Sequence, residues 1–141
     1  MQDAITFGLA FLGYLLVAAN VVLHFRKRPR RELLLVMAAV ILVHVGLVWS
    51  LRFGWSLTLA WNKGPAGFVI FHAALVLLCG AAVVPDPWSR RLLYTAFPIV
   101  SAGGLGATFT YDFVAGYRLP LLAALVGTLL LCWLGYRRGI P

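Results

Sequence analysis

Five long apolar runs dominate the chain and leave little room for any other structure. They cover approximately residues 4–25, 33–51, 66–84, 92–114 and 119–136. An α-helix rises about 1.5 Å per residue, so roughly 20 apolar residues are needed to cross the hydrocarbon core of a bilayer. The runs therefore predict an all-α, polytopic transmembrane bundle of five spans, with residues 1–141 forming a single membrane domain.

The segments between the runs contain residues that end helices. Residues 26–32 form a basic turn, Pro65 precedes the third run and Pro85 follows it. Proline cannot continue the hydrogen-bond ladder of a helix, so it suits these boundaries. The turn before the fifth run has only residues 115–118, and Asp112 lies near the end of the fourth run. A bundle of four spans is therefore the alternative to five.

The composition excludes a water-soluble domain. Hydrophobic residues make up 62% of the chain and charged residues 11%, and the mean hydropathy is +0.94. A soluble protein of 141 residues needs far more polar surface than this. The net charge of +8 could indicate a nucleic-acid partner, but the cations lie at the ends of the apolar runs. This placement is typical of a topology signal, so we expect no nucleic-acid binding.

The basic residues also predict the orientation. Three of the twelve lysines and arginines, Arg52, Lys63 and Arg118, fall on one side of the five-span arrangement. Cytoplasmic loops are rich in Lys and Arg, so the more basic side should be cytoplasmic. We therefore expect the N-terminus outside and the C-terminus inside a bacterial cytoplasmic membrane. The other nine cations are Arg26, Lys27, Arg28, Arg30, Arg31, Arg90, Arg91, Arg137 and Arg138.

Two histidines lie deep within predicted spans, where polar groups are costly and often functional. His44 is seven residues from the outer end of its run at Leu51. His72 is six residues from the outer end of its run at Ala66. The two helices are antiparallel neighbours, so both imidazoles should lie roughly 10 Å below the outer interface.

Histidines at equal depth on two helices suggest several kinds of chemistry. His44 and His72 could supply both axial nitrogens of a b-type haem. They could also bind copper or zinc, or donate a hydrogen bond to a quinone. The structural alternative is that each imidazole bonds to a carbonyl or hydroxyl of a neighbouring helix.

Further residues would complete a haem site. Gly103 and Gly104 could leave room for the edge of the macrocycle, and Arg52 or Lys63 could pair with the propionates. Gly103 also forms a small-xxx-small pair with Ala107, a pattern typical of close helix packing in membranes. Packing is the alternative interpretation of this glycine-rich face.

Three other features lead to structural expectations. The outer loop alternates large and small residues over 55–61, which favours an extended segment on the membrane surface. His24 ends the first run beside the basic turn, so we expect it at the interface. Asp112 and Arg118 flank the short turn before the fifth run, which predicts an ion pair between them; the alternative is that Asp112 is a carboxylate at which protons enter.

One stretch resembles a known family. It reads Ser89-Arg90-Arg91-Leu92-Leu93-Tyr94-Thr95-Ala96-Phe97-Pro98 and leads into a glycine-bearing helix. This is similar to the small multi-span membrane proteins linked to assembly of haem-copper cytochrome oxidase. That family has a His-Arg-Arg turn before a Phe-Pro helix, with Ser89 here in place of the histidine. Its preceding helix carries a histidine that His72 would match. The resemblance implies a role around respiratory haem proteins and no defined activity.

These observations leave three classes of function. The first is a membrane subunit or assembly factor of a respiratory or other electron-transfer complex, holding haem b through His44 and His72. The second is an accessory subunit without a cofactor that packs on a larger membrane complex. The third is a small transporter, which the scarcity of charge within the spans disfavours. No catalytic motif is present, so we expect no enzymatic activity from the chain alone.

Overall fold

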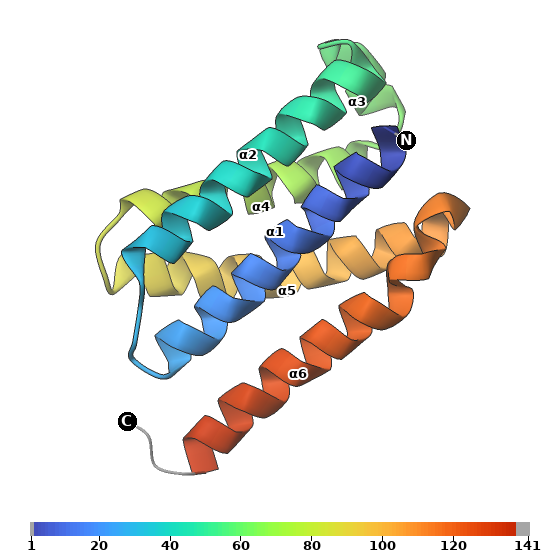
Figure 1. Ribbon diagram of the computed structural model, residues 1–141. Helices are drawn as coiled ribbons and strands as arrows, with labels where there is room; N and C mark the ends of the chain where they lie inside the picture. The colour runs from blue at the N-terminus through green and yellow to red at the C-terminus, as the bar shows by residue number, and fades with distance from the viewer. Residues whose placement is uncertain (1, 138–141) are drawn as a thin grey trace.

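The computed structural model describes residues 2–137, so Arg138, counted above among the cytoplasmic cations, lies outside the described residues. All regular structure in this part of the chain is helical. The elements are α1 (Gln2–Phe25), α2 (Arg31–Phe53), α3 (Leu57–Asn62), α4 (Pro65–Val83), α5 (Trp88–Thr110), the 3-10 helix η1 (Asp112–Tyr117) and α6 (Arg118–Arg137) (Figure 1).

Five helices are long and apolar enough to cross a membrane: α1, α2, α4, α5 and α6. They correspond in order to the five predicted runs, so the prediction of an all-helical bundle with five such helices is confirmed. The largest shift is in α5, which begins and ends about one turn earlier than the predicted run 92–114. The fifth candidate span is continuous with η1, since it covers Val114–Arg137.

The five long helices pack in a ring in the order α1, α2, α4, α5, α6, and α6 returns to α1. A further contact between α1 and α5 crosses the middle of the ring. Helix α1 consequently has three long neighbours, α2, α5 and α6, and occupies a central place in the bundle (Figure 1).

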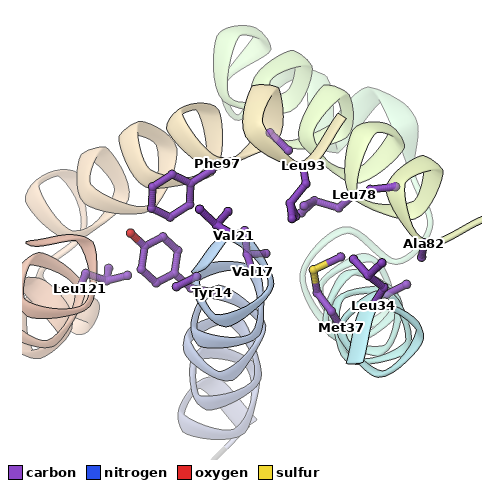
Figure 2. Packing of buried hydrophobic residues seen from close by; sticks show 14 residues of the cluster. Tyr14, Val17, Val21, Leu34, Met37, Leu78, Ala82, Leu93, Phe97 and Leu121 are labelled. Atoms are coloured by element: carbon purple, nitrogen blue, oxygen red, sulfur yellow. The ribbon is translucent and has the colours of Figure 1, made fainter. Parts of the chain in front are cut away.

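The core joins these helices through two groups of side chains. Tyr14 of α1 stacks on Phe97 of α5, with ring centroids 6.2 Å apart, and its hydroxyl lies 3.1 Å from Ser101 Oγ. Leu121 of α6 lies beside them (Figure 2). The second group joins α1, α2, α4 and α5, and includes Val17, Val21, Leu34, Met37, Leu78, Ala82 and Leu93 (Figure 2).

The prediction of an extended segment over residues 55–61 was wrong. Residues 57–62 form α3, and the Ser56 hydroxyl caps it by accepting a hydrogen bond from Leu59 N at 3.3 Å. An extended segment with no partner strand would leave its backbone groups unpaired near the membrane. A helical turn satisfies part of them internally, and this outweighs the alternating pattern.

The predicted Asp112–Arg118 ion pair does not form. Helix α5 ends at Thr110, and Asp112 begins η1. Arg118 instead donates from Nε to Thr108 O at 2.7 Å, and its guanidinium lies 4.9 Å from the centroid of the Phe109 ring. The carbonyls at a helix C-terminus are acceptors without intrahelical partners, so the end of α5 attracts this cation.

Candidate functional site

His44, the first predicted ligand, is directed toward α1. Its Nδ1 lies 2.9 Å from the backbone oxygen of Thr6. A carbonyl oxygen only accepts hydrogen bonds, so Nδ1 must carry the hydrogen. The imidazole therefore links α2 to the first turns of α1, as the structural interpretation predicts.

His72 uses both ring nitrogens within the bundle. Its Nδ1 donates to Phe68 O at 2.7 Å, and its Nε2 accepts from Trp49 Nε1 at 3.3 Å. The ring also stacks on Phe68, with centroids 4.0 Å apart. An indole nitrogen can only donate, so these two bonds fix the neutral tautomer of His72. The Trp49–His72 bond joins α2 to α4.

The two imidazoles face different helices. His72 lies opposite Trp49, and His44 is five residues earlier on α2, which is about 7.5 Å along the helix axis. Five residues also correspond to a rotation of about 140° around the axis. Trp49 consequently points to α4 while His44 points to α1, and the two side chains do not share one space.

The remaining predicted site residues are dispersed among protein contacts. A Cβ on Gly103 would lie 3.2 Å from Phe71 of α4, and one on Gly104 would lie 3.9 Å from Leu121 of α6. The Arg52 guanidinium lies 5.2 Å from the centroid of the Phe7 ring on α1. Lys63 is the C-cap of α3. Both glycines thus face side chains of the bundle, as the packing interpretation predicts.

This geometry does not favour a haem between His44 and His72. Axial ligation needs two Nε2 atoms that face each other across the metal, but one of them accepts from Trp49. Haem or metal ligation by this pair stays a prediction. Within residues 2–137, no group of three or more His, Cys, Asp or Glu side chains is arranged to hold a metal ion.

A buried polar cluster, which the sequence did not reveal, lies where α1 meets the turn between α4 and α5. Asn20 is fully buried, and its amide nitrogen donates to Leu16 O at 2.9 Å and Leu33 O at 3.4 Å. His24 is only 3% exposed, so its side chain packs inside the bundle and does not reach out to the surface as a snorkelling residue would. The spacing of four residues was the available signal, since it places Asn20 and His24 on one helix face.

A groove between α4 and α5 is the second feature of the bundle surface. Its lining includes Phe71 and five small residues, Gly67, Ala102, Gly103, Gly106 and Ala107. Ala102 and Gly106 are exposed and lie four residues apart on α5. A Cβ on Gly106 would meet no atom within 4 Å. The groove therefore presents bare backbone outward, beyond what packing within the bundle requires.

Comparison with protein-family models, with curated proteins and with solved structures gave no match.

Proposed function

We propose that this chain is a small accessory subunit or assembly factor that packs on a larger integral membrane complex. The groove between α4 and α5 carries the proposal. Bundle packing already uses Gly103, yet Ala102 and Gly106 remain bare on the outward face of α5. Small residues four apart let two helix backbones approach closely in a membrane, and a helix of the partner would fit this face.

The hydrogen bonds of the histidines support a role without a cofactor. His44 bonds to Thr6 O and His72 bonds to Phe68 O and Trp49, so both imidazoles already contribute to the bundle. These bonds give Nδ1 of both rings, and Nε2 of His72, a partner within the bundle.

An electron-transfer complex of the bacterial cytoplasmic membrane is the partner class that we propose. The support is the resemblance of residues 89–98 to proteins linked to cytochrome oxidase assembly. In this proposal the end of the bundle with the basic turn faces the cytoplasm.

Gly106→Leu tests the proposed surface. In the isolated bundle the new side chain points into open space, so the protein should fold. It should nevertheless prevent close approach of a partner helix. In native gels of mildly solubilised membranes, the wild-type chain should migrate with a haem-containing complex and the variant as a free subunit.

Gly127→Leu is the matched control. Gly127 lies on α6, and a Cβ there also meets no atom within 4 Å, but this residue does not line the groove. The control should stay in the complex. A wild-type chain that migrates alone, or only with copies of itself, would contradict the proposal.

An optical spectrum of the purified chain tests the alternative with haem b. A low-spin haem spectrum that disappears in both His44→Ala and His72→Ala would establish ligation by this pair. We expect no such band, because Trp49 already donates to Nε2 of His72.

A further inference from the structure

His24 and Asp86 meet at the end of the bundle that carries the basic turn, which we call the basic end. His24 is in the last turn of α1, and Asp86 is in the turn between α4 and α5. His24 Nε2 lies 3.8 Å from Asp86 Oδ1. The histidine side chain is nearly fully buried, whereas the aspartate side chain is 50% exposed. The pair thus connects a buried imidazole to the surface.

The other ring nitrogen of His24 determines what Nε2 can do. Nδ1 lies 2.9 Å from the backbone oxygen of Asn20. Since that oxygen only accepts, Nδ1 carries a hydrogen. In a neutral ring, Nε2 would then be a bare acceptor facing a carboxylate. Nε2 is buried and has no hydrogen-bond partner.

Two facing acceptors need a proton between them or a donor that bridges them. A water molecule that donates to two acceptors holds them roughly 4.5 Å apart, because each bond is about 2.8 Å long. The observed separation of 3.8 Å is shorter. A protonated imidazole fits this separation, since a small rotation brings its N–H into hydrogen-bond range of the carboxylate.

We propose that His24 and Asp86 form a proton-operated latch that holds the turn between α4 and α5 against α1. In the closed state, the imidazolium donates from Nε2 to the Asp86 carboxylate. When water at the basic end takes the proton, the ring becomes neutral and keeps its hydrogen on Nδ1. Nε2 then presents its lone pair to the carboxylate, and the attraction is lost.

A second attachment of the turn involves α2 and does not depend on this proton. The Arg31 guanidinium donates to Val83 O and Val84 O, both at 2.9 Å. Ser89 also fixes the start of α5, because its hydroxyl donates to Ala81 O at 2.6 Å. Opening of the latch therefore frees the turn from α1 while it stays attached to α2.

Other charged or titratable side chains surround the basic end. Asp86 is the acid that the described structure places within ion-pair distance of His24. The latch therefore depends on this carboxylate. The groups besides Asp86 include Arg26, Lys27, Arg28 and Arg30 between α1 and α2, Arg31 and Glu32 on α2, Arg90 and Tyr94 on α5, and Cys132 on α6.

Ring-nitrogen NMR tests the protonation step. The full chain, labelled with 15N-histidine and placed in lipid nanodiscs, is titrated from about pH 5 to pH 9. We expect His24 to show an imidazolium signal in the wild type that weakens or disappears in Asp86→Asn, because the variant removes the carboxylate that pairs with the protonated ring. His44 and His72 are internal references, since neither has a carboxylate within 4 Å in the described residues.

Asp112→Asn is the matched control, because it removes a carboxylate outside the pair and should leave the His24 signal unchanged. The latch would be overturned if His24 stayed neutral throughout the titration. It would equally be overturned if its imidazolium signal ended at the same pH in the wild type and in Asp86→Asn.

Hydrogen exchange tests whether the proton moves the turn. After correction for intrinsic rates, exchange at residues 84–89 should increase severalfold as the wild-type imidazolium signal disappears. In Asp86→Asn it should be fast and independent of pH. If the wild-type exchange rate does not follow the His24 signal, the ion pair does not hold the turn in place, and the proposal is refuted.

Discussion

The three histidines make the same kind of hydrogen bond through Nδ1, and they differ in the group that faces Nε2. Each places Nδ1 against a backbone oxygen, which belongs to Thr6, Asn20 or Phe68. The indole of Trp49 donates to the second nitrogen of His72, whereas a carboxylate faces that of His24. At this scale the neighbour of Nε2, and not the depth of the histidine, separates a structural imidazole from one that could carry a proton.

The sequence predicted how deep each histidine lies within its helix, but not which neighbouring helix its side chain faces. Counting along the runs identified His44 and His72 as residues within spans. Helix α2 has no continuous polar face, so the sequence does not indicate how this helix is rotated about its axis. The rotation is set by contacts such as Trp49 with His72, and these could not be inferred from spacing alone.

Trp49→Phe should destabilise the bundle modestly. The phenyl ring keeps most of the aromatic contact with Phe68 and His72 but cannot donate to Nε2. Interhelical hydrogen bonds in membranes contribute on average about 0.6 and at most about 1.7 kcal/mol, and we expect a loss in this range. Reversible unfolding in mixed micelles measures it.

Trp61→Phe is the comparison for that measurement. Trp61 packs on Phe68 with centroids 5.7 Å apart, but it is exposed and makes no described hydrogen bond to His72. An equal loss of stability in both variants would mean that the Trp49–His72 bond contributes nothing measurable.

Helix α5 shows how glycine allows two elements to approach. Gly103 faces Phe71 and Ile70 of α4, and these residues occupy the space that a side chain would need. The glycine-rich run predicted close packing, and the contacts of Gly103 agree with that prediction. Which neighbour each glycine faces could not be predicted, because the ring order of the helices is a long-range property.

Gly103→Leu should be more damaging than Gly104→Ala. A Cβ at Gly103 already lies 3.2 Å from Phe71, so a leucine must displace α4 or the phenyl ring. The expected loss is roughly 1–3 kcal/mol, as for ordinary overpacking. A Cβ at Gly104 lies 3.9 Å from Leu121, which is normal contact. Thermal unfolding in detergent compares them, and equal midpoints would contradict this assignment of the two faces.

The short helix α3 depends on its cap. Ser56→Ala removes the hydroxyl that accepts from Leu59 N, which should cost about 1 kcal/mol of local helix stability. Hydrogen exchange over residues 57–62 should rise accordingly, by about fivefold. Thr58→Ala lies in the same helix and leaves the cap intact, so its exchange should stay near the wild-type rate.

At the scale of the whole molecule, run length was sufficient to predict five helices long and apolar enough to cross a membrane. The bilayer fixes the length of a helix that crosses it, so composition alone identifies such elements. The order of the helices along the chain did not predict that α6 packs against α1. Contacts between the first and last helices leave no local pattern in the sequence.

Reporter fusions test the orientation. A reporter after Pro141 should read as cytoplasmic and one before Met1 as external, because the basic end should face the cytoplasm. A reporter inserted within 84–87 should agree with the C-terminal fusion. Both termini on the same side would contradict five spans and support four.

The central place of α1 has a consequence for synthesis in the cell. Helix α1 leaves the ribosome first, but two of its three long neighbours, α5 and α6, are made after residue 87. The hydroxyl of Tyr14 meets its partner Ser101 only after 87 further residues have been translated. During that interval lipid or the insertion machinery must cover the polar edge of α1, so completion of this bundle waits for its C-terminal third.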